Sequence, residues 1–378
     1  MGFVLTEEQE AIRRAARDLM RERAPVTELR RLRDSKDADG YLKTAWREMA
    51  GLGMVGMAIP ERYGGAGLGW TELGLLLEES GRTLAATPLM STVVLGASAV
   101  LLGGTEAQRR EVLMGVCEGR TLLALAHDEG TRHAPYGITT RAEPSAGRWR
   151  LHGDKSFVLD GHVADTLIVV ARSSGERGRE GLTLFLVPAR APGVTITRLS
   201  LVDSRNAARV RLAGVEVTEA DVLGSVGKGA DILDRVLDRG SIALSAETLG
   251  SLQEAFERTV EYLKVRKQFG VPIGSFQALK HRAAHLYCEV ELSRSIVADA
   301  LAALDEERAE VPMLASVAKA RTSDAFLAIA NEAIQLHGGI GVTDELDIGF
   351  FLKRARVAEQ TLGSASHHRD RFARLRGY

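Results

Sequence analysis

The spacing of apolar residues changes twice along the 378-residue chain and divides it into three segments. In the first segment apolar positions recur every three or four residues, which is typical of amphipathic helices. From Thr121 to about Ala213 the apolar runs are short, β-branched and separated by Gly, Asp, Ser and Pro, which indicates strands. After Gly229 long helical patterns return. We therefore expect a helical domain (1–119), a β domain (120–225) and a second helical domain (226–378).

Caps and stop signals predict where the helices begin and end. Thr6, with Gln9 three residues later, should open a first helix that runs to Pro25. Further helices are expected at 42–50, 71–81, 88–102 and 105–118, and then at 230–264, 276–306 and 312–336. The glycine-rich stretch 53–69 lacks the Lys-Ser/Thr pair of a P-loop, so we expect an ordinary loop there.

Charge and composition exclude several classes of protein. The 49 Lys and Arg residues nearly balance the 50 Asp and Glu residues, so nothing indicates a nucleic-acid partner. Only Cys117 and Cys288 are present, which excludes a disulfide scaffold and a cysteine metal cluster, and no metal site is expected. The most apolar region, 88–104, is too short and too polar for a membrane span. With no secretory signal pattern, we expect a cytoplasmic protein.

Two long helices are expected to meet at a tight elbow that carries Arg266 to Phe269. Gly270 supplies a helix stop, Pro272 keeps the helix from resuming, and Ser275 is placed to cap the next helix. An arginine fork beside an aromatic ring suits a ligand that carries phosphate and can stack. For an isolated arginine, a solvated cation near the helix C-terminus would be the simpler interpretation.

The elbow string Arg-x-Gln-Phe-Gly-x-Pro-Ile-x-x-Phe-Gln resembles the signature segment of acyl-CoA dehydrogenases, which are flavoproteins. A second motif, Gln-Leu-His-Gly-Gly-Ile-Gly from Gln335, resembles a glycine segment of the same family. Adjacent glycines let backbone N–H groups approach an anionic or planar ligand, although Gly-Gly alone would be an ordinary helix cap. In the family both segments bind the adenosine and pyrophosphate of FAD, usually across a subunit boundary. The matching positions are Arg266, Gln268, Phe269, Gln277, Gln335, Gly338 and Gly339.

The resemblance spans essentially the whole chain. It implies the acyl-CoA dehydrogenase fold, which is mainly α with a small antiparallel β-barrel-like middle domain and a C-terminal four-helix bundle. It also implies FAD as cofactor, an acyl-CoA thioester as substrate, an electron-transferring flavoprotein as acceptor, and an oligomer, usually a tetramer.

The residues expected around the flavin ring depart from the family pattern. In the loop 127–135, Asp128 replaces the Thr that bonds the pyrimidine edge of the flavin. Phe157 stands in the place of a Trp that packs on the isoalloxazine ring, and Leu159 replaces a Thr that donates to the flavin. A core strand that ends in an Asp-Gly turn is an equally good interpretation of 157–161.

The catalytic base is missing from both positions that the family uses. The reaction needs a carboxylate with a raised pKa to take the α-proton of the thioester. Leu362 and Gly240 occupy the two positions, and neither can accept a proton. Glu247 lies two turns beyond Gly240 in an apolar neighbourhood, so it is either a relocated base or half of a buried ion pair. Glu359 and Asp128 are more remote alternatives.

Three hypotheses follow from these departures. The first is a subunit of a heteromeric acyl-CoA dehydrogenase that acts on bulky thioesters such as steroid side chains or dicarboxylic chains. In such assemblies one subunit type brings the base and the other completes the FAD pocket. The second is a self-sufficient homotetramer with Glu247 as base. The third is a non-catalytic relative that binds no flavin.

Overall fold

The computed structural model describes residues 4–145 and 147–378, and its chain forms two compact units. Of the described residues, one unit comprises those within 4–31, 70–85 and 241–378, and the other comprises those within 32–69, 86–145 and 147–240. Each unit is therefore assembled from stretches that lie far apart in the sequence. Within the described residues, no helix has the length and apolar character needed to cross a membrane.

The first unit is a bundle of long helices. It contains α1 (Glu7–Arg23), α4 (Trp70–Arg82), α8 (Gln277–Asp305), α9 (Val311–His337), α10 (Ile348–Gln360), α11 (Ala365–Leu375) and most of α7 (Ala230–Val265). Thr6 and Gln9 form the predicted capping box at the start of α1, because each side chain accepts a hydrogen bond from the backbone N–H of the other. The three long C-terminal helices lie within one residue of their predicted ends.

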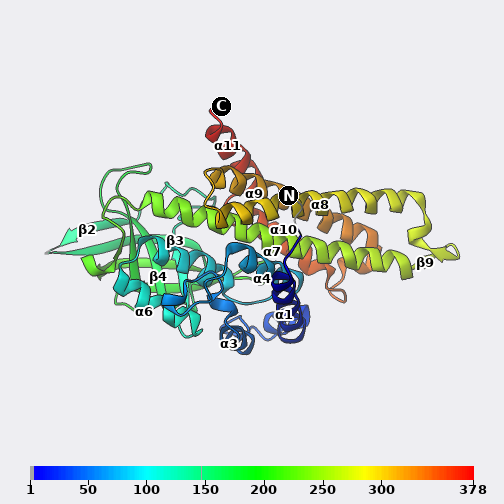
Figure 1. The fold of residues 1–378 in the computed structure, drawn as a ribbon, viewed down its shortest axis with the longest axis horizontal. Coiled ribbons are helices and arrows are strands. Elements are labelled where there is room, and N and C mark those ends of the chain that lie inside the picture. The colour runs from blue at the N-terminus through cyan, green and yellow to red at the C-terminus, as the bar shows by residue number, and fades with distance from the viewer. Residues whose placement is uncertain (1–3, 146) are drawn as a thin grey trace. The chain divides into compact units, whose positions relative to one another are not determined.

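The second unit combines short helices with a sheet. Its helices are α3 (Lys43–Gly51), the π-helix η3 (Leu89–Gly96), α5 (Ala97–Gly103), α6 (Glu106–Cys117) and the 3₁₀ turns Met54–Gly56, Glu61–Tyr63 and Glu219–Asp221. Its strands are β1 (Leu123–Ala126), β2 (Arg141–Ser145), β3 (Arg148–Leu159), β4 (Thr166–Arg172), β5 (Leu182–Pro188), β6 (Val194–Ser200), β7 (Asn206–Val217) and β8 (Val222–Leu223). Figure 1 shows the strands in green and the first helices in blue.

The sheet is mixed, whereas the expectation was an antiparallel one. Its order is β6-β7-β3-β2-β4-β5-β8, with β1 paired to β4. Most neighbours run antiparallel, but β1 and β2 both pair parallel to β4. Alternating side chains such as Leu151, Val169, Phe185 and Val210 are fully buried and form the core of this unit. A period of two shows which strands exist, but it does not show the direction in which they pair.

One N-terminal helix was not predicted, and another differs from its prediction. A separate helix, α2 (Val26–Asp34), follows Pro25. Proline is as well suited to begin a helix as to end one, because its missing N–H is not needed in the first turn. The single helix expected at 88–102 is a π-helix followed by α5.

The elbow between α7 and α8 is a short hairpin with its tip at Phe269 and Gly270 (Figure 1). Strands β9 (Lys267–Gln268) and β10 (Val271–Pro272) pair, and both tip residues have positive φ. This backbone matches the twist of paired strands, and the Gly at the second position adopts it without strain. Ser275 does not cap α8, because its hydroxyl donates to the Pro272 carbonyl at 2.7 Å and Phe276 occupies the N-cap.

Candidate active site

The hairpin that carries Arg266 is open to solvent. The backbone of Arg266 is fixed, since its N–H donates to the Tyr262 carbonyl at 2.9 Å and its carbonyl accepts from Ile273 at 2.8 Å. The side chain of Phe269 is 90% exposed at the tip, with its ring edge towards Phe276. A fixed backbone with exposed cationic and aromatic side chains leaves their binding groups available to a ligand or a second chain.

The glycine segment after α9 is also open. Gly338 has positive φ, and a Cβ added to Gly338 or Gly339 would meet no atom within 4 Å. The Tyr262 hydroxyl donates to the His337 carbonyl at 3.2 Å, and the two rings stack with centroids 4.3 Å apart. This contact brings the end of α9 beside the last turn of α7, and so brings the two sequence motifs together.

The residues matched to adenosine and pyrophosphate binding share one property, which is exposure to solvent. They are Arg266, Gln268, Phe269, Gln277, Gln335, Gly338 and Gly339. His337, which lies inside the second motif, is buried and contacts the Ala333 carbonyl at 2.7 Å through Nδ1. It is therefore a packed, hydrogen-bonded residue, as expected for a histidine at a helix end.

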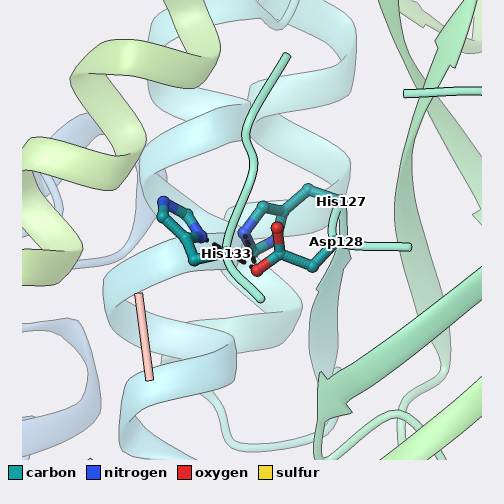
Figure 2. Close-up of side chains that lie close together, drawn as sticks. All are labelled: His127, Asp128 and His133. Atoms are coloured by element: carbon teal, nitrogen blue, oxygen red, sulfur yellow. Dashed lines mark hydrogen bonds and ion pairs between the residues drawn. The ribbon is translucent and has the colours of Figure 1, made fainter. Parts of the chain in front are cut away.

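The loop after β1 is closed on itself, because Asp128 is engaged by two histidines (Figure 2). Oδ2 of Asp128 lies 2.9 Å from His133 Nδ1 and 3.1 Å from His127 Nε2, and Oδ1 accepts from the Ala134 N–H at 3.1 Å. Burial by itself would raise the pKa of Asp128, but the His127 imidazole and the hydrogen bonds hold that pKa below its usual range. The carboxylate predicted to meet a flavin is thus already occupied within this chain.

A β-bulge in β3 turns Phe157 outwards. The pairing register with β7 shifts between Lys155 and Val158, and Phe157 has positive φ and is 51% exposed. Lys155 is fully buried, and its ammonium donates to Glu129 at 2.7 Å. Phe157 is therefore not a core residue, which contradicts the core-strand interpretation at this position.

At the two positions where the family carries its catalytic base, this chain has no side chain that can accept a proton. Gly240 lies within α7, and Leu362 follows α10 with positive φ and its side chain buried. The Leu362 carbonyl accepts from His368 Nε2 at 2.9 Å, and the next carbonyl, of Gly363, accepts from the Lys319 ammonium at 3.0 Å. Among the described residues, no group accepts a hydrogen bond from the Leu362 N–H.

Lys319 and His368 are buried titratable residues that the sequence interpretation missed. Burial lowers the pKa of Lys319 to about 7 and that of His368 to about 3. Both side chains hold the turn at Leu362 by donating to its carbonyls. A lone lysine inside the small apolar run 314–320 was the available signal, since a lysine there can be accommodated only if it is paired.

Glu247 forms a buried ion pair. Its Oε1 lies 3.4 Å from Nη1 of Arg354 on α10, and both side chains are almost wholly buried. A buried ion pair was one of the two alternatives that the sequence left open. Glu359 is half-buried, and its carbonyl accepts from Lys319 at 3.2 Å.

Comparison with known proteins covers nearly the whole chain. Three family models match: "Acyl-CoA dehydrogenase, N-terminal domain" at 6–120, "middle domain" at 124–215 and "C-terminal domain" at 227–375. The short-chain specific acyl-CoA dehydrogenase of Megasphaera elsdenii is 32% identical, with 95% of each chain covered. The predicted fold class, with helical N-terminal, β middle and helical C-terminal domains, is confirmed.

Two solved structures are also similar. The "Tcur3481-Tcur3483 steroid ACAD G363A variant" has a TM-score of 0.88 at 34% identity, covering 98% of this chain and 97% of that one. The ChsE4-ChsE5 complex from Mycobacterium tuberculosis has a TM-score of 0.91 at 27% identity, covering all of both chains.

Proposed function

Since the chain belongs to the acyl-CoA dehydrogenase family, whose members are FAD-dependent oxidoreductases, we propose that it is one subunit of a heteromeric acyl-CoA dehydrogenase. It contributes Arg266 and the segment 338–339 to an FAD whose ring and catalytic base belong to a partner subunit. One observation carries this proposal. The seven residues matched to the adenosine and pyrophosphate are all exposed, whereas Asp128 on the ring side is already engaged.

The open segments fit a dinucleotide. The Arg266 guanidinium can form a bidentate pair with a pyrophosphate, and the exposed Phe269 ring can stack on an adenine. The bare backbone at Gly338 and Gly339 admits close approach, because no Cβ intervenes. FAD, when bound, supplies the acceptor for the electron pair that leaves the substrate.

The base has to come from elsewhere. The Leu362 N–H retains the donor that the family resemblance assigns to the thioester oxygen, and Lys319 and His368 fix its turn. Without a carboxylate at positions 240 or 362, however, no group there can take the α-proton. The pair formed by Glu247 and Arg354 further disfavours a base at that position.

The relatives support the substrate class that we propose. Because the similar structures include a steroid-type enzyme of two named chains and the ChsE4-ChsE5 complex, we assign a bulky acyl-CoA thioester such as a steroid side chain. An electron-transferring flavoprotein is the proposed electron acceptor.

The test is flavin stoichiometry and bleaching. The chain is purified alone and with the partner that co-purifies from its native host, and each sample is mixed with acyl-CoA under anaerobic conditions. We expect one FAD per pair of unlike chains and bleaching only in the complex. One FAD per chain in the isolated protein, bleached by acyl-CoA, would overturn the proposal. A flavin-free complex would indicate a non-catalytic relative.

Glu247→Gln serves as the discriminating variant in the same assay. Removing one member of a buried ion pair costs roughly 3–5 kcal/mol of folding stability, so the variant should unfold at lower denaturant concentration. Bleaching by the folded fraction of the complex should be unchanged. Abolished bleaching in a folded, flavin-loaded variant would identify Glu247 as the base instead.

A further inference from the structure

The cluster of His127, Asp128 and His133 has the composition of a metal site. One potential ligand atom from each of the three side chains lies within 4.8 Å of the other two. Two imidazoles and one carboxylate form a donor set that suits divalent transition metals, which bind imidazole nitrogen strongly. We propose that this loop binds a divalent transition-metal ion of the zinc class, a site that the sequence did not predict.

The spacing of the donor atoms is close to what a metal requires. Two ligands of a tetrahedral zinc ion, each about 2.1 Å from the metal, lie about 3.4 Å apart. The carboxylate oxygen Oδ2 of Asp128 lies 3.1 Å from His127 Nε2 and 2.9 Å from His133 Nδ1. To hold the ion, the carboxylate oxygen has to move slightly away from both nitrogens, and the two rings, whose centroids lie 5.6 Å apart, have to approach each other.

His127 supplies a second, independent observation. His127 is buried, with a relative exposure of 8%. Its Nε2 atom makes no hydrogen bond of acceptable geometry to a described residue. The 3.1 Å contact with Asp128 has the length of a hydrogen bond but not its direction. A buried polar atom of this kind needs a partner, and a metal held between the ring and the carboxylate would provide one.

Hydrogen bonds from neighbouring backbone N–H groups hold Asp128 and its loop in place. The Ala134 N–H donates to the other carboxylate oxygen of Asp128, and the Ser156 N–H donates to the Asp128 carbonyl at 2.8 Å. Such contacts orient ligands before a metal arrives. The nearest buried cation, Lys155, is paired with Glu129 at 2.7 Å, so its charge is balanced locally.

Figure 2 shows the rings of His127 and His133 beside the same carboxylate, that of Asp128. The site is built within one compact unit and uses none of the exposed residues assigned to FAD. Metal binding and flavin binding by this chain can therefore be measured separately, and the failure of one leaves the other standing.

The experiment uses the full-length chain without an affinity tag, stripped with a chelator and titrated with zinc chloride. We expect one zinc ion per chain and a rise in melting temperature that EDTA reverses. His133→Ala and Asp128→Asn should weaken zinc binding at least tenfold, as losses around metal sites do. The control His152→Ala removes an exposed histidine of β3 and should bind like the wild type.

Titration with Co²⁺ tests directly which side chains coordinate the metal. Co²⁺ bound at the site should give a visible absorption band that His133→Ala removes and His152→Ala retains. Failure of the wild type to bind either ion would establish a cluster held by hydrogen bonds alone. Equal binding by all variants would identify adventitious surface binding, and either result overturns the proposal.

Discussion

The segments at the ends of α7 and α9 present open polar groups, whereas the loop from His127 to His133 pairs its polar groups with one another. Arg266 and Gly339 are exposed, and a Cβ added to Gly339 would meet no atom of the described residues within 4 Å. Asp128 is engaged by two imidazoles and a backbone N–H. A ligand that used Asp128 would first have to break these contacts in a buried setting, whereas a ligand at Gly339 displaces only water.

The two regions therefore differ in what they can bind. The open segments retain what a flavin held by another subunit would need from this chain. The closed loop holds a carboxylate between two imidazoles, a set of donor atoms that suits a small ion better than a planar ring. The predictions below test each side of this contrast.

The largest expected effect tests how firmly the turn at Leu362 is held. His368 is buried and donates to the Leu362 carbonyl, and burial lowers its pKa to about 3. Between about pH 6.5 and 3 the unfolded chain takes up a proton that the folded chain does not, so stability falls as pH is lowered. The full shift corresponds to roughly 5 kcal/mol at 1.36 kcal/mol per pKa unit.

His368→Gln keeps a donor for the Leu362 carbonyl but cannot titrate. Urea midpoints measured from pH 7.5 to 4.5 should therefore fall less steeply in this variant than in the wild type. His152→Gln, which alters an exposed histidine, should follow the wild-type curve. Parallel curves for all three proteins would mean that the turn at Leu362 is loosely held.

The next effect tests the open side directly. Arg266→Ala removes a charge-assisted contact of roughly 1.5–3 kcal/mol, so the flavin affinity of the assembled enzyme should fall about ten- to a hundredfold. Lys267→Ala removes the adjacent exposed cation of the same hairpin and should change affinity far less. Flavin retention during dilution measures both. Equal retention by wild type and Arg266→Ala would remove the hairpin from the cofactor site.

The sequence predicts the long helices well because a spacing of three and four repeats over many residues. It predicts the two open motifs because each is a contiguous string. It leaves Phe157 open between a flavin contact and a core position, because a period of two places the ring on the same face as buried Lys155, and only the bulge reverses this. It also leaves open the pairing of Glu247 with Arg354, 107 residues apart, because that contact depends on how α7 and α10 pack.

The third prediction tests the closed side. Asp128→Asn keeps the shape of the side chain but removes the charge that both imidazoles contact, so folding stability should fall by about 1–3 kcal/mol. Flavin affinity of the assembled enzyme should stay within about twofold, which is less than 0.5 kcal/mol. Chemical denaturation and flavin retention on the same samples separate the two effects. A large loss of flavin with unchanged stability would show that Asp128 contacts the cofactor.

The smallest expected effect is also the most selective. Gly339 lies in the turn after α9 without positive φ, and an added Cβ would meet no atom within 4 Å. Gly339→Ala should therefore change folding stability by no more than about 0.5 kcal/mol. If a cofactor approaches this backbone closely, the same methyl group should weaken flavin binding by about tenfold, or 1.4 kcal/mol.

Gly349→Ala is the matched control, because Gly349 lies in α10 and an added Cβ there also meets no atom within 4 Å. Alanine in a helix should raise stability slightly, by about 0.4–1 kcal/mol, and leave flavin affinity unchanged. The two variants therefore compare a methyl group added at the proposed cofactor contact with a methyl group added away from it. If both variants retain flavin like the wild type, the openness at Gly339 is not used for the cofactor, and the exposed residues at the ends of α7 and α9 serve assembly alone.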